Sequence, residues 1–141
     1  MIETLRLSER GKSQLTKLRR SNAIKHWNAL CRWALCTSLA DPRPVGGARL
    51  VADSNIEISW KVLTGDLGDV YLALLEQRAQ LDEVGLAPKD LSMLLRRHVH
   101  RGIELLAGDK PPTIIELCES ACKNNISSSM VEPSRTPAHS L

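Results

Sequence analysis

The chain has 141 residues, 43% of them hydrophobic and 25% charged, and its formal net charge is +3. This size predicts one globular domain with a core of modest size, with or without a tail. No run approaches the ~18 apolar residues that a membrane span needs, and the first residues lack the apolar stretch of a signal peptide. We therefore expect a cytoplasmic protein that has no membrane association and whose four cysteines are reduced thiols.

The residue types favour helices, and the charges are unevenly distributed. Leucine dominates, while Phe is absent and only one Tyr and three Trp occur, which disfavours a β-sandwich or barrel. Eight Lys and Arg residues precede position 33, against only Glu3 and Glu9. Such a basic segment suits a polyanion, with nucleic acid as the first expectation and an acidic protein as the second.

The first two predicted elements are a strand and a short helix. Leu5 and Leu7 alternate with polar neighbours over residues 4–7, which is typical of a half-exposed strand. Ser8 then offers an N-cap for a helix over residues 9–20, whose apolar positions share one face and whose other faces are basic.

The next segment, residues 24–39, predicts a helix that is apolar on nearly all sides. Such a helix lies either at the centre of a domain or in an interface between subunits. We expect its Trp27 and Trp33 to be buried in one of these two places. Two prolines, Pro42 and Pro44, end the helix because proline disfavours helical backbone in the residue before it.

Three further elements follow a loop around Gly46. Apolar and polar residues alternate over residues 56–62, which predicts a second strand. Helices are predicted over residues 69–84, which Gly85 ends, and over residues 88–107, which Pro88 opens and Gly108 caps. The expected inward residues of the first helix are Val70, Ala73, Leu74, Gln77 and Leu81. Those of the second are Leu91, Leu94, Leu95, Val99, Ile103 and Leu106.

The C-terminal residues divide into a short helix and a tail. Thr113 and Glu116 form a capping-box pattern that predicts a short helix ending at residue 123. The last residues, 124–141, carry too little apolar surface to offset the entropy of ordering them, so we expect a disordered tail. The predicted organisation is one helical domain over residues 1–108, a helical extension over 109–123, and this tail.

The predicted fold class is mainly α, with an N-terminal strand and two helices, then a short strand and two to three further helices. Its first three elements have the layout of ribbon-helix-helix proteins, in which two chains pair their strands into a ribbon that can enter the major groove. The outward Thr4 and Arg6 would then meet base edges or phosphates. The alternative is an ordinary helical protein with an extended N-terminal arm and a solvated basic face.

The sequence contains no recognisable catalytic or cofactor motif. His98 and His100 point about 200° apart on a helix, so they cannot share one ion. Cys118 and Cys122 have suitable spacing for two metal ligands, but Cys31 and Cys36 diverge, and buried cysteines commonly act as small apolar residues. We expect no bound metal, no cofactor and no enzymatic activity.

The expected DNA-contacting surface surrounds the first helix. Its members are Arg6, Arg10, Lys12, Lys17, Arg19, Arg20 and Lys25. Few of them have a carboxylate at helical spacing, so most should be free to meet phosphates. A second basic cluster, Arg96, Arg97 and Arg101 with His100, serves for comparison.

Three segments carry a resemblance to a known family. They read KHWNALCRWALC at residues 25–36, ADSNIEISWKV at residues 52–62, and HVHRGI at residues 98–103. In order and spacing these segments resemble the DndE family of DNA sulfur modification proteins. The resemblance covers roughly residues 5–107, and the remaining C-terminal residues lie outside it.

The resemblance implies a role in phosphorothioation, in which sulfur replaces a non-bridging oxygen of a DNA phosphate. It also implies that partner subunits carry the chemistry: a cysteine desulfurase, an iron–sulfur protein similar to sulfurylation enzymes, and an ATPase. DndE-like proteins are expected to bind double-stranded DNA and to form homo-oligomers, here a dimer or a tetramer. The sequence therefore predicts a DNA-binding accessory subunit. The alternatives are a ribbon-helix-helix repressor and a scaffold that does not bind DNA.

Overall fold

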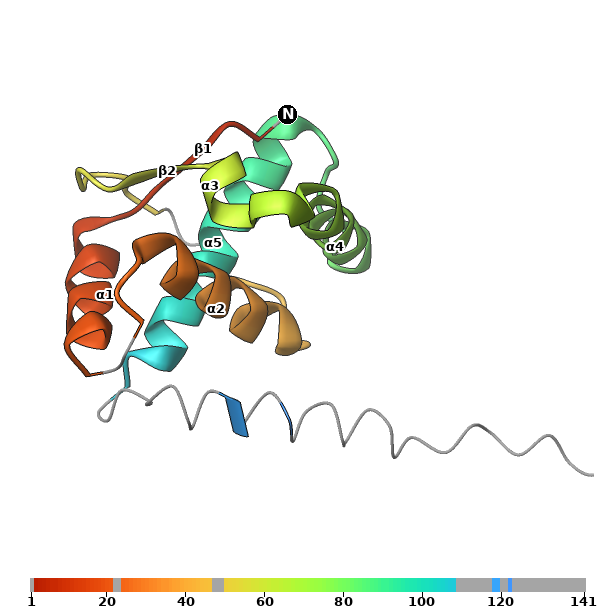
Figure 1. Cartoon of the computed structure of the whole chain (residues 1–141). Coiled ribbons are helices and arrows are strands. Elements are labelled where there is room, and N and C mark those ends of the chain that lie inside the picture. The colour runs from red at the N-terminus through yellow and green to blue at the C-terminus, as the bar shows by residue number, and fades with distance from the viewer. Residues whose placement is uncertain (1, 22–23, 47–49, 109–117, 120–121, 123–141) are drawn as a thin grey trace, which may run out of the picture.

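The protein is mainly helical, which confirms the fold class expected from the sequence. The computed structural model describes residues 2–21, 24–46, 50–108, 118–119 and 122. Within them the elements are β1 (Thr4–Arg6), α1 (Glu9–Ser21), α2 (Trp27–Ala40), β2 (Glu57–Ser59), α3 (Trp60–Thr64), η1 (Gly65–Leu67), α4 (Gly68–Leu81) and α5 (Pro88–Leu106) (Figure 1). The predictions for residues 109–123 and 124–141 lie outside the described residues, except that Cys118, Glu119 and Cys122 are helical.

Helix α5 runs through the middle of the protein, and the other elements pack around it (Figure 1). All six of its predicted inward residues are buried, together with His98 and Gly102. Helix α2 crosses α5 so closely at Gly102 that a Cβ there would lie 1.7 Å from the carbonyl oxygen of Ala34. The central position of α5 thus follows from its apolar face, and its contact with α2 follows from a single glycine.

Strands β1 and β2 form a two-stranded antiparallel sheet within this one chain. Leu5 lies opposite Ile58, and both side chains are buried. The Leu7 amide also donates to the Ile56 carbonyl at 3.1 Å. In the ribbon-helix-helix layout the first strand pairs with that of a second chain, but here β2 supplies the partner from about fifty residues further along the same chain.

The second strand is shorter than predicted, because a helix begins at Trp60. The Ser59 hydroxyl accepts a hydrogen bond from the Val62 amide at 3.2 Å, and α3 follows directly. Leu63 and Thr64 are buried, whereas Val62 is exposed. The alternation of Trp60 and Val62 therefore falls in a helical turn, because the serine cap outweighs a strand preference that few residues support.

The buried face of α4 also differs from the prediction. Leu75 and Ala79 are buried, while the predicted inward residues Val70, Leu74 and Leu81 expose 53%, 40% and 71% of their surface. Apolar residues occur on several sides of this helix, so its periodicity alone does not select one face. The helix ends at Leu81 rather than at residue 84, and the positive φ of 56° that follows belongs to Glu83, not to Gly85.

The structure also tests the predicted burial of two tryptophans and the predicted helix caps. Trp27 and Trp33 are half-buried and pack against the core from its edge, so neither is buried within the core of this chain, and burial between subunits stays a prediction. Ala107, not Gly108, is the C-cap of α5. The Ser8 cap of α1 is confirmed, since its hydroxyl accepts from the Gly11 amide at 3.0 Å.

Candidate nucleic-acid interface

Helix α1 presents the basic segment because its apolar face is anchored in the core. Gly11, Leu15 and Leu18 are buried, and a Cβ on Gly11 would lie 3.2 Å from the His100 ring of α5. The His100 ring also accepts a hydrogen bond from the Ser8 amide through Nε2 at 3.1 Å. The N-terminal end of α1 is therefore held against α5, and its basic side chains project from the remaining faces.

Five of the seven predicted DNA contacts, all but Lys17 and Arg20, already have protein partners. Arg6 forms an ion pair with Glu57 at 2.8 Å, directly across the β1–β2 ladder. Lys12 Nζ donates to the Asn55 side-chain oxygen at 2.7 Å. These partners come from distant parts of the chain, so a search for carboxylates at helical spacing misses them.

Arg10 is paired more weakly than Arg6. Its guanidinium lies 3.4 Å from a carboxylate oxygen of Glu104, and both side chains are largely exposed. Exposed ion pairs of this kind contribute little to stability and are readily exchanged for other partners. Arg10 thus remains able to turn towards a phosphate, whereas Arg6 also donates to the Ser54 carbonyl and is more firmly held.

The C-terminal end of α1 is tied to α2 by two cations. The Arg19 guanidinium lies over the Trp27 ring, 4.8 Å from its centroid. Lys25 Nζ donates to the Arg19 carbonyl at 2.9 Å, which satisfies one of the open carbonyls at the helix end. Both side chains therefore shape this end of α1 as well as adding charge to it.

Lys17 and Arg20 are the cations of α1 that stand clear of the rest of the protein. Both are exposed, and they are three residues apart, so they lie on the same side of the helix. Among the described residues, neither forms an ion pair or a side-chain hydrogen bond. Of the seven predicted residues, these two therefore have the most freedom to bind an anion.

The comparison cluster on α5 is not a second free patch, because Arg101 holds the end of α2. Arg101 donates to the Ser38 carbonyl at 2.8 Å, the Ser38 hydroxyl at 2.7 Å and the Arg43 carbonyl at 2.6 Å. Arg78 of α4 joins it, donating to the carbonyls of Leu39 and Asp41. Two guanidinium groups at one helix C-terminus complement its negative dipole end. This role of Arg78 and Arg101 could not be predicted from the sequence, because their partners are backbone carbonyls, which every residue has.

The two histidines of α5 have separate partners and do not converge on one point. His98 is buried, and its Nδ1 lies 2.8 Å from the Ser38 hydroxyl. Burial, together with the nearby Arg101 and Arg78, lowers the pKa of His98 to about 4. His100 accepts from the Ser8 amide and burial lowers its pKa, so the expectation that it belongs to a second basic cluster is wrong. Among the described residues, no group of three or more metal-ligating side chains is found.

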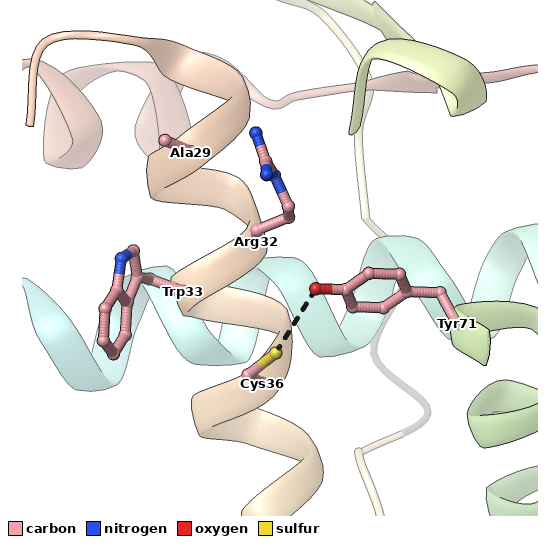
Figure 2. Close-up of a pocket in the computed structure, with 5 residues that line it drawn as sticks. All are labelled: Ala29, Arg32, Trp33, Cys36 and Tyr71. Atoms are coloured by element: carbon pink, nitrogen blue, oxygen red, sulfur yellow. Dashed lines mark hydrogen bonds between the residues drawn. The ribbon is translucent and has the colours of Figure 1, made fainter. Parts of the chain in front are cut away.

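A cavity of about 280 Å³ lies between α2 and α4, on a different side of α2 from the core (Figure 2). Arg32, Trp33, Cys36 and Tyr71 line it, and the Cys36 sulfur lies 4.0 Å from the Tyr71 hydroxyl. Burial raises the pKa of the Cys36 thiol above its usual value, despite opposing effects of Tyr71 and Arg32. A protonated thiol is a poor nucleophile.

Cys31 is even less suited to chemistry, because it lies in the core and burial raises its pKa to about 12. Cys118 and Cys122 are exposed.

In the described part of the chain, no helix is both long and apolar enough to span a bilayer.

Comparisons with known proteins agree with one another. Residues 4–112 match the family described as DNA sulphur modification protein DndE. The fold is similar to that of DndE from Escherichia coli B7A, involved in DNA phosphorothioation modification, with a TM-score of 0.62 and 21% identity over 75% of this chain and 99% of that one. A DndE G21/24K mutant involved in DNA phosphorothioation gives a TM-score of 0.59 and 20% identity over 75% of this chain and 100% of that one. No protein of curated function matches by sequence.

Proposed function

Since this chain belongs to the DndE family of DNA sulphur modification proteins, we propose that it is a DNA-binding accessory subunit of a phosphorothioate modification system. It contacts the backbone of double-stranded DNA for partner enzymes that insert the sulfur. Those partners are an iron–sulfur sulfurtransferase-like protein and an ATPase. The observation that carries the proposal is the exposed basic face of α1, where Lys17 and Arg20 have no partner among the described residues.

The physical basis of binding is electrostatic. Phosphates bind Lys and Arg side chains and release counterions as they do so, which makes affinity strongly dependent on salt. Around the Lys17 and Arg20 pair, Arg10 and Arg19 add further positive charge. Contacts of this kind position a protein on a duplex and carry little sequence information. That property suits a subunit that presents DNA to an enzyme.

A role without catalysis fits the state of the two thiols on α2. Sulfur transfer through a protein cysteine needs an accessible thiolate. The pKa values of Cys31 and Cys36 are both raised, chiefly by burial, so both thiols remain protonated near neutral pH. The proposal therefore assigns the chemistry to the partner subunits.

Of the two alternatives, the scaffold has an observation in its favour and the repressor does not. Val70, Leu74 and Leu81 form an exposed apolar stripe on α4 that would suit a protein partner. The repressor needs a ribbon shared by two chains, but β1 pairs with β2 of its own chain and Arg6 is engaged by Glu57. A scaffold that does not bind DNA is therefore the second candidate.

The test is a salt titration of DNA binding with two charge-reversed proteins. Lys17→Glu combined with Arg20→Glu should weaken binding sharply and flatten the slope of log K against log salt by about two units. Arg19 is left intact because it packs on Trp27. The matched control is Lys61→Glu with Lys89→Glu, which reverses two exposed cations outside α1 and should change binding far less.

Neutral variants distinguish the loss of phosphate contacts from misfolding caused by charge reversal. Lys17→Gln with Arg20→Gln should lose roughly the same slope, because each removes one phosphate contact. Unrelated duplex sequences should be affected alike. If the Lys61→Glu, Lys89→Glu control loses DNA binding and the Lys17→Glu, Arg20→Glu variant does not, the assignment of the DNA-binding surface to α1 is wrong. If the parent protein does not bind DNA at low salt, the scaffold replaces the DNA-binding subunit.

A further inference from the structure

A second cavity, of about 250 Å³, lies on the other flank of α4 from Tyr71. Its apolar lining includes Ile2, Leu72 and Leu91, of which Ile2 and Leu91 are buried. Trp60 of α3 forms part of the wall, close to the first turn of α4: a Cβ on Gly68 would lie 3.4 Å from the indole nitrogen. Four separate segments of the chain thus build one apolar hollow with an aromatic side chain in its wall.

Two carboxylates complete the lining of this cavity. Asp69 and Glu76 are exposed residues two turns apart on α4, and at about 100° per residue they share a flank with Leu72. Among the described residues, no cation forms an ion pair with either of them, although Lys61 and Lys89 lie on the neighbouring elements. The cavity therefore combines an apolar interior, an aromatic ring and negative charge that has no partner in the described part of the chain.

We propose that this cavity receives a lysine or arginine side chain from a partner protein. These side chains have an apolar stem and a charged end, so the stem can lie against Leu72 and Leu91 while the cation meets the carboxylates. Trp60, which also lines the cavity, adds aromatic surface to the wall against which the stem packs. Charge complementarity selects a basic occupant over an apolar or acidic one. This surface is separate from the basic face of α1, so its failure leaves the proposed DNA role standing.

The binding test uses the full-length protein labelled with ¹⁵N and small probes. Nα-acetyl-lysine N-methylamide and its arginine counterpart should shift the Trp60 indole N–H resonance saturably, with a Kd in the millimolar range expected of a single side chain. The norleucine counterpart has a similar stem without the charge and should bind more weakly. Norleucine binding as tight as lysine binding, or no shift with any probe, would overturn the proposal.

Variants then assign the effect to the two carboxylates. Asp69→Asn with Glu76→Gln should raise the Kd of the lysine probe by about threefold or more, since two exposed charge interactions are lost. Glu83→Gln is the control, because it neutralises an exposed carboxylate near α4 that does not line the cavity, and it should leave the Kd unchanged. An unchanged Kd in the double variant would refute the proposal. Loss of the shift on concentrating the protein, reversed by dilution, would also refute it by showing that a second copy fills the cavity.

Discussion

The protonation state of His100 follows from its two neighbours. Its Nδ1 lies 2.7 Å from the Arg96 carbonyl, which can only accept, so Nδ1 carries the hydrogen. Its Nε2 accepts from the Ser8 amide and must therefore be unprotonated. A second proton would sit on Nε2 and point its N–H at the Ser8 amide N–H, at the N-terminal end of α1. Burial also lowers the pKa of His100, so two separate causes keep this ring neutral.

We predict that the protein loses stability on mild acidification because of His98 and His100. Both have folded-state pKa values below the unfolded value of about 6.5, so the unfolded chain binds more protons at lower pH. The stabilisation is complete above pH ~6.5 and declines as the pH falls towards about 4, the pKa of His98. Urea unfolding at pH 7 and pH 5 should show a loss of about 1 to 2 kcal/mol from the buried His98.

The histidines can be distinguished from the acidic groups by the pH at which stability falls. Arg43 holds the pKa of Asp41 well below its usual range, so the contribution of Asp41 is lost only below its unfolded pKa of about 3.8. Titration of the imidazole resonances should show His98 charging near pH 4 and His100 charging at a lower pH than an exposed histidine. Equal unfolding free energies at pH 7 and pH 5 would contradict the prediction.

At the scale of elements, the crossing of α2 and α5 depends on Gly102. The Cβ of any other residue would lie 1.7 Å from the Ala34 carbonyl oxygen and 2.3 Å from its carbon. Both are backbone atoms of a helix that Arg78 and Arg101 also hold at its C-terminal end. The two helices can therefore separate only by disturbing the core between them.

We predict that Gly102→Ala destabilises the protein by about 3 kcal/mol or more, or prevents folding, because helix backbone must move to admit one methyl group. Thermal unfolding followed by circular dichroism measures the loss. Gly46→Ala is the control, since a Cβ there meets nothing within 4 Å, and it should stay within about 0.5 kcal/mol of the parent. A Gly102→Ala protein that melts with the parent would show that the helices are not in such close contact.

At the scale of the whole molecule, the exposed apolar stripe of α4 is a candidate surface for contact with another subunit. Val70, Leu74 and Leu81 lie on the same outer face of the helix, next to the flank that carries Tyr71 and the α2–α4 cavity. Half-buried Trp33 lines that cavity from α2. Exposed apolar side chains on one helix face are typical of protein interfaces. We therefore expect a dimer or tetramer in which a second copy covers this face and Trp33.

We predict that the parent protein is a dimer or tetramer by light scattering and that Leu74→Glu lowers its mass while preserving its helical circular dichroism. Burying a carboxylate in an apolar interface costs several kcal/mol, which is enough to dissociate subunits. Leu105→Glu is the matched control, because Leu105 is similarly exposed, at 46%, on α5. A monomeric parent, or dissociation by the control alone, would reject this interface.

Sequence by itself determined what depends on neighbours a few residues away. The serine cap and apolar face of α1, the proline start of α5 and all six inward residues of α5 were predicted correctly because capping and periodicity are local. The family was also readable from three short segments, and the match over residues 4–112 confirms it. The basic character of the α1 surface needed no structure, since it follows from eight cations in the first 32 residues.

Tertiary structure alone decided which residues meet across long separations. β1 finds its partner in β2, Arg6 finds Glu57 and Arg101 finds the end of α2, each from about fifty residues away or more. The same packing turned Leu75 of α4 inward and left Leu74 exposed. Two neighbouring leucines are equivalent in a local pattern, and the surface against which a helix packs chooses between them. For that reason Lys17 and Arg20 could be separated from the five other predicted contacts only once the whole chain was folded.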